Sequence, residues 1–216
     1  MKRRASRVTR SKPKLRPVSL RTTSSPTRPV AISVGSAVQI FAANERINQI
    51  LIENLDPSVW TAKAASSKPP GATRNTSIRP IAAIFTHMHN VRCKWIRLTA
   101  PHLKVPPQLS RAHCTPQQAS SALAESAARC TEMLTDALCG DGRVKKFLRD
   151  AWARPWPAGP EMLCYMLAHE AHHRGQICML SHQLGFPLSG KVTSDMWNWE
   201  RLWKESGSPL GSARDY

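Results

Sequence analysis

Two histidines one helical turn apart are the residues of this chain best placed to do chemistry. His169 and His173 lie in the stretch 159–185, which reads GPEMLCYMLAHEAHHRGQICMLSHQLG. We predict one helix here, because Pro160 suits the first helical position and Gly185 suits a left-handed C-terminal cap. Imidazoles at positions i and i+4 of a helix can meet at one divalent metal ion.

A helical wheel places both histidines on the apolar face of this helix. With about 100° per residue and His169 at zero, the residues within about 80° are mostly apolar. They are Met162, Tyr165, Met166, His173, Gln176, Ile177, Leu180 and Leu184. Burying two imidazoles without a common partner is costly, so the pattern favours a metal site. The alternative is a pair of ordinary core histidines, each hydrogen-bonded to a neighbour.

The residues around the two histidines suggest further roles. The letters HEAHH match the zinc-protease pattern H-E-x-x-H, but the continuation Arg-Gly-Gln lacks the third ligand of those enzymes, so a protease is disfavoured. Glu170 is expected to be a solvated carboxylate outside the ligand set. Gln176 could orient a bound ligand or a histidine N–H. Arg174 could pair with a substrate carboxylate, but a solvated or interhelical charge is favoured. No general base is assigned.

A second predicted helix, over residues 78–98, supplies a third histidine. With His87 at zero on the wheel, four apolar residues lie within about 80° of it; they are Ile84, Val91, Trp95 and Leu98. His87 is therefore expected to point inward. His89 lies about 160° away and is expected to point outward, beside Arg92. His87 would complete a three-histidine metal site; by itself it could equally be a core histidine bonded to a carbonyl.

The other predicted helices complete a helical bundle. One covers about residues 35–55 and has one inner face, formed by Phe41, Asn44, Asn48, Leu51 and Leu55. Another begins after Thr115, where Gln118 completes a capping box, and runs to about residue 138. A short helix is expected near 143–151. After the last long helix come three tryptophans, at positions 197, 199 and 203. The segment that carries them is expected to pack back on the bundle, and a ligand-stacking role for them is less favoured. Four amphipathic helices predict an all-α four-helix bundle.

The chain is strongly basic, and much of the excess charge lies near its start. It has 216 residues and a formal net charge of +17, and residues 1–44 contain ten Lys or Arg and no acid. Residues 1–33 are predicted to be a disordered basic tail, because they lack an apolar period. Such a tail could bind nucleic acid or anionic surfaces through charge, act in targeting, or have no role; the last is favoured.

Length and cysteine usage indicate one domain in a reducing compartment. Residues 34–206 are expected to form the bundle and 207–216 a C-terminal tail. The six cysteines form no C-x-x-C pair, which indicates reduced thiols and a cytoplasmic location. No run approaches the roughly 18 apolar residues of a membrane span, and no secretory signal is recognised near the start.

Two motifs make the chain resemble a known family. IFTHMHNVRCKW on the second helix and YMLAHEAHHRGQI on the last long helix resemble the DinB-like (YfiT-like) metalloenzyme family, over about residues 36–204. The resemblance implies an up-down-down-up bundle, often a homodimer. It also implies that His87, His169 and His173 hold one divalent metal, commonly zinc or nickel.

The resemblance also implies a function. Relatives include transferases and isomerases that depend on a low-molecular-weight thiol. We therefore expect a metal-dependent enzyme that acts as a thiol S-transferase or isomerase on a small electrophilic substrate. The alternative is a non-catalytic bundle stapled by its metal, with the basic tail binding nucleic acid or anionic surfaces. Nucleic-acid binding by any other part of the chain is not expected.

Overall fold

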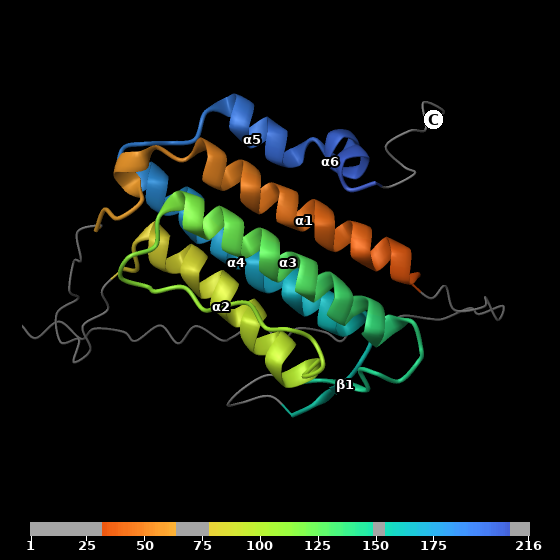
Figure 1. The fold of residues 1–216 in the computed structure, drawn as a ribbon. Coiled ribbons are helices and arrows are strands. Elements are labelled where there is room, and N and C mark those ends of the chain that lie inside the picture. Colours follow the sequence, from red (N-terminus) through yellow and green to blue (C-terminus); the bar gives the residue numbers. More distant parts are fainter. Residues whose placement is uncertain (1–31, 64–77, 149–153, 208–216) are drawn as a thin grey trace, which may run out of the picture. The chain divides into compact units, whose positions relative to one another are not determined.

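The described part of the chain is mostly helical. The computed structural model describes residues 32–63, 78–148 and 154–207. In chain order the elements are α1 (Val34–Asn54), the 3-10 helix η1 (Pro57–Val59), α2 (Ile81–Thr99), α3 (Pro116–Leu138), β1 (Lys146–Phe147), β2 (Trp156–Pro157), α4 (Pro160–Gln183), α5 (Gly190–Trp197) and α6 (Trp199–Glu205) (Figure 1). The predicted tails, residues 1–33 and 207–216, lie almost entirely outside the described residues.

The predicted signals at the ends of the helices are found in the structure. At the start of α3 the Thr115 hydroxyl accepts from the Gln118 N–H, and the Gln118 side chain accepts from the Thr115 N–H. Helix α4 begins at Pro160, as predicted. Gly185 follows its end with φ of +89°, a backbone conformation that glycine adopts without steric cost. These local signals explain why the predicted helix ends were close to the observed ones.

The connection between α2 and α3 runs back along α2, so these two helices point the same way. The Asn90 side chain exchanges two hydrogen bonds with the backbone of Leu109. Just before α3, the Cys114 carbonyl accepts from the Trp60 indole at 2.6 Å, and Trp60 O accepts from Ala82 in the first turn of α2. Helices α1 and α4 run in the opposite direction (Figure 1). Both α1 and α2 pack against α3 and against α4.

Two clusters of buried apolar side chains lie between the four long helices. One surrounds Phe85 and Leu51, and the other surrounds Phe41 and Trp95. The predicted inner face of α1 is confirmed, because its five residues are all buried: Phe41, Asn44, Asn48, Leu51 and Leu55. Packing of such faces contributes more to helix stability than intrinsic propensity does.

A small β-ladder replaces the short helix predicted near residues 143–151. Lys146 pairs with Pro157 and Phe147 with Trp156 in an antiparallel arrangement. Phe147 is buried against Trp95, with ring centroids 6.2 Å apart. The prediction was wrong because the ladder depends on a partner segment that follows several residues later, a contact that helical periodicity cannot report. Residues 149–153 lie outside the described ranges.

The C-terminal helices α5 and α6 pack on α1, as the sequence suggested. Val192 and Leu202 are buried against α1 residues, namely Ala43, Ile47 and Ile50. The Trp199 and Trp203 rings have centroids 5.1 Å apart, whereas Trp197 is 70% exposed. Within the described ranges, no helix has both the length and the apolar content that crossing a membrane requires.

Candidate metal centre

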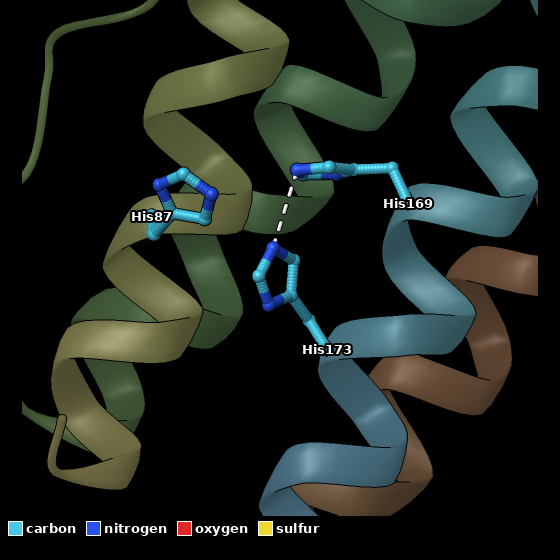
Figure 2. Close-up of side chains that lie close together, drawn as sticks. All are labelled: His87, His169 and His173. Carbon is cyan, nitrogen blue, oxygen red and sulfur yellow. Dashed lines mark hydrogen bonds between the residues drawn. The ribbon is translucent and has the colours of Figure 1, made fainter. Parts of the chain in front are cut away.

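Three histidines from two helices converge on one point. His87 comes from α2, and His169 and His173 come from successive turns of α4 (Figure 2). One ring nitrogen from each lies within 4.8 Å of the other two. The His173 ring centroid is 4.7 Å from that of His87 and 4.6 Å from that of His169. The structure thus brings the three predicted side chains together, while metal binding itself stays a prediction.

The spacing of the ring nitrogens fits ligands of one metal ion. The Nε2 atoms of His169 and His173 are 3.2 Å apart. Zinc–imidazole bonds are about 2.0–2.1 Å long, so two such ligands at a tetrahedral angle have nitrogens about 3.3 Å apart. Three imidazoles suit zinc, nickel, iron or copper. The donor set and its spacing are therefore compatible with the cofactor predicted from the sequence.

Gln176 determines which nitrogen of His173 carries a proton. His173 Nδ1 is 2.8 Å from Gln176 Oε1. Because an amide oxygen only accepts hydrogen bonds, Nδ1–H is the donor, and Nε2 keeps its lone pair. Nε2 is the atom that faces His169 (Figure 2). The predicted role of Gln176 in orienting a histidine N–H is confirmed.

Burial favours the neutral form of two of these rings. Desolvation, aided by nearby positive charges, lowers the pKa of His87 to about 4. Desolvation is also the largest cause of the lowered pKa of His173, although the hydrogen bond to Gln176 opposes it. Neutral imidazole is the form that binds metals. At neutral pH both rings can therefore accept a cation without first losing a proton.

Two aromatic rings contact the His169 ring. The Trp95 ring makes an edge contact with it at a centroid distance of 5.4 Å, and the Tyr165 ring stacks on it at 6.2 Å. Trp95 is itself 1% exposed. These contacts restrict the orientations that the His169 ring can take, so the imidazole is held toward the other two histidines.

Glu170 is fully buried, which corrects the prediction of a solvated carboxylate. Arg92 Nε donates to Glu170 Oε1 at 2.6 Å, and Arg92 Nη2 donates to Oε2 at 2.7 Å. Asn44 and Asn48 donate to the same Oε2 at 2.6 and 2.8 Å. Burial opposes ionisation of Glu170, but the charge and hydrogen bonds of Arg92 outweigh it and lower its pKa. We call these four residues the polar core.

Arg92 is also completely buried, although the wheel placed it on the outer face of its helix. Besides Glu170 it contacts Glu45 at 2.7 Å and donates to the Leu123 carbonyl at 2.8 Å. The reason is that α2 packs against α3 as well as α4, so it is covered on more than one side. A helical wheel that assigns one inner face to α2, centred on His87, does not identify the second side of α2 that is covered.

His89 shares this second covered face and was likewise predicted wrongly. It is 0% exposed. Its Nδ1 lies 3.1 Å from Ser126 Oγ and its Nε2 lies 2.8 Å from Pro107 O. The carbonyl accepts, so Nε2–H donates. Both ring nitrogens have partners within the protein, and His89 takes no part in the three-histidine cluster.

Arg174 on α4 is hydrogen-bonded to two side chains of α1, which decides between the roles that the sequence left open for it. Its Nη1 donates to Asn44 Oδ1 at 2.7 Å and to Asn48 Oδ1 at 2.9 Å. The same two asparagines donate to Glu170, so one network joins α1, α2 and α4. Of the sequence-based interpretations of Arg174, an interhelical charge is the one observed.

A broad cavity opens beside His173. Its volume is about 880 Å³, and its lining includes His172, His173, Gln176, Arg79, Met179 and Gln183. This volume is in the range of small-molecule sites. A second cavity, of about 480 Å³, lies on the α1 side of α4 and is lined in part by Trp197 and Trp199. The first cavity contains a cluster histidine and its hydrogen-bond partner, so it is the candidate substrate site.

Comparison with known proteins connects this geometry with a family. The model described as the DinB family matches residues 32–198. The matched range contains all three histidines and the whole polar core. A search of curated proteins found no match. The family resemblance inferred from the two histidine motifs is therefore confirmed.

Proposed function

The chain belongs to the DinB family, and from this premise we propose that it is a divalent-metal-dependent enzyme. His87, His169 and His173 hold the metal, with zinc or nickel preferred. The reaction is a thiol-dependent S-transfer or isomerisation of a small electrophilic substrate. The observation that carries the proposal is the convergence of three imidazoles within 4.8 Å, one of which, His173, lines an open cavity.

The number of ligands favours chemistry over a purely structural site. Structural zinc sites usually have four protein ligands, whereas catalytic sites keep a position open. Among the described residues, the cluster has three members. When bound, a divalent metal supplies Lewis acidity that favours the deprotonated form of a thiol or water.

The chain's own residues prepare the site for this chemistry. Gln176 holds the Nδ1 proton of His173 and leaves Nε2 available. Trp95 and Tyr165 orient His169. The polar core joins α4 to α1 and α2, the helix that carries His87. These contacts preorganise the ligand set before any cation binds.

The thiol in this proposal comes from outside the chain. A thiolate, not a thiol, is the reactive nucleophile. Burial raises the pKa of Cys93 to about 11 and also raises the pKa values of Cys114 and Cys178. Among the described residues that line the cavity beside His173 there is no cysteine. A separate low-molecular-weight thiol is therefore the co-substrate that fits the site.

The same proposal includes the topology of the helices, the oligomeric state and the location in the cell. The directions of α1–α4 support an up-down-down-up four-helix bundle within residues 34–206, flanked by tails at 1–33 and 207–216. A homodimer follows from the family resemblance and is tested by light scattering. A cytoplasmic location is suggested by six unpaired cysteines and is tested by fractionation.

The first experiment measures metal content by elemental mass spectrometry, on protein purified without a His tag. We expect about one metal per chain in the wild type and loss of it in His173→Ala. The matched control is His172→Ala, which removes an exposed neighbouring histidine outside the cluster and should keep the metal. No metal in the wild type, even after incubation with zinc or nickel, would overturn the proposal.

The second experiment separates an enzyme from a metal-stapled bundle. Thiols are screened with electrophilic substrates, and His87→Ala is compared with the wild type. An enzyme loses thiol transfer in this variant with little change in melting temperature. A stapled bundle instead shows mainly a lower melting temperature. If the basic tail binds nucleic acid, that binding is salt-sensitive and disappears when residues 1–33 are removed.

A further inference from the structure

The cavity beside His173 has a basic side chain, Arg79, in its lining. Arg79 is the single Arg or Lys among its described lining residues, and no Asp or Glu is among them. Arg79 precedes Pro80, the N-cap of α2, and is exposed. Within the part of the chain that the structure describes, no carboxylate forms an ion pair with Arg79. The guanidinium is therefore available to a bound molecule.

The nearby buried carboxylate does not neutralise this cavity. Glu170 follows His169 in the sequence, but it is 0% exposed and paired with Arg92. Imidazole ligands bind a metal in their neutral form and so would add no negative charge to a bound dication. The cavity therefore has a positive potential that attracts anions.

The rest of the lining is suited to an apolar group. Ile84, Met179 and Leu180 line the same cavity as Arg79. A molecule with an apolar body could contact these side chains while its charged end reaches the guanidinium. Arginine binds a carboxylate through two parallel N–H···O bonds, which fix the orientation of the ligand.

We propose that Arg79 binds the carboxylate of a small organic acid, whose apolar body lies against Ile84, Met179 and Leu180. The inference rests on the proposed function, because it assigns a substrate class to the same site: the substrate is a carboxylate-bearing small molecule. Arg79 is then a specificity residue that distinguishes this acid from its uncharged amide.

The test uses benzoate and its uncharged analogue benzamide as probes of the full-length protein. The protein carries ¹³C-labelled methionine methyl groups, and the Met179 signal is assigned with Met179→Leu. Each probe is titrated into metal-free protein while the Met179 signal is followed. We expect benzoate to shift this signal and to bind more tightly than benzamide.

Three variants locate the source of the preference. Arg79→Gln should weaken benzoate binding about tenfold, the loss expected for one charge-assisted hydrogen-bonded pair, and should leave benzamide binding unchanged. Arg79→Lys should recover part of the affinity. Arg97→Gln is the control, because it removes an equal exposed charge from the last turn of α2, and it should have no effect.

The result can contradict the inference in three ways. It is overturned if benzoate does not shift the Met179 signal, if benzamide binds as well as benzoate, or if Arg79→Gln binds benzoate as tightly as the wild type. Metal content is measured on the same preparations after incubation with zinc. A benzoate preference in a chain that binds no metal would retain the anion site and reject the proposed metalloenzyme. Bound metal without a preference for benzoate would reject the anion site and retain the proposed metalloenzyme.

Discussion

His169 and Glu170 are neighbours in the sequence, but their side chains leave α4 toward different partners. The His169 ring faces His173, with an Nε2–Nε2 distance of 3.2 Å. The Glu170 carboxylate receives two hydrogen bonds from Arg92, at 2.6 and 2.7 Å. One turn of α4 thus carries both a candidate ligand and the buried ion pair that fixes the helix against α2. Stability and ligand geometry are therefore coupled at this turn.

Replacing Glu170 by Gln should destabilise the fold strongly. The substitution keeps the size of the side chain but leaves Arg92 buried with less negative charge around it. Breaking a buried ion pair costs about 3–5 kcal/mol, and we expect the lower end, because Glu45 still contacts Arg92 at 2.7 Å. Urea denaturation at pH 7 measures the free energy of unfolding.

The control for this experiment is Glu53→Gln. Glu53 contacts Arg46 at 2.9 Å, and its side chain is 52% exposed. Exposed pairs contribute about 0–1 kcal/mol, so this variant should differ little from the wild type. Equal effects of the two substitutions would contradict the assigned importance of the polar core.

The stability of the metal-free protein should fall as the pH is lowered from about 6.5 to about 4. The pKa of His87 drops from 6.5 to about 4 in the folded protein. Between these values the unfolded chain binds a proton that the folded chain does not, so acid favours unfolding. Urea denaturation at a series of pH values measures this slope.

His87→Gln should make the slope above pH 5 shallower, because the glutamine does not titrate; the lowered pKa of His173 leaves part of the slope in place. Below the ordinary carboxyl pKa of 4.5 the lowered pKa of Glu170 adds a further loss of stability with falling pH, and this part should persist in the variant. An unchanged slope between pH 6.5 and 5 would show that His87 is not protonated on unfolding.

Replacing Gln176 by Ala should weaken metal binding without removing it. The variant loses the acceptor that holds His173 Nδ1–H, so the ring can rotate or change tautomer. Loss of such supporting hydrogen bonds typically lowers metal affinity about 10–100-fold. Competition with a zinc chelator measures the affinity. Gln183→Ala, which alters the same cavity lining, should bind metal like the wild type.

His87 and His89 should respond in opposite ways to substitution. His87→Ala should lose the metal and keep a nearly unchanged stability in the metal-free state. His89→Ala should keep the metal but lose about 1–3 kcal/mol of unfolding free energy, because buried groups bonded to its ring lose their partner. Metal content and urea denaturation are measured for both. Retained metal in His87→Ala would contradict the assigned ligand set.

The sequence by itself determined the features that depend on local order. Helix ends followed from Thr115, Pro160 and Gly185, because caps and turns involve residues a few positions apart. Periodicity placed His87, His169 and His173 on inner faces, because side-chain direction repeats with the helical turn. The motifs around these histidines also identified the family.

Tertiary structure decided which polar residues are buried and what they contact. Arg92 and Glu170 are 78 positions apart, and a helical wheel carries no information about a partner on another helix. The same holds for His89, whose outward side is covered by α3 and the connection before it. A charge or an imidazole is stable inside a protein when partners satisfy it. Those partners, like the set of described residues that line the cavity around Arg79, come together only after the helices have packed.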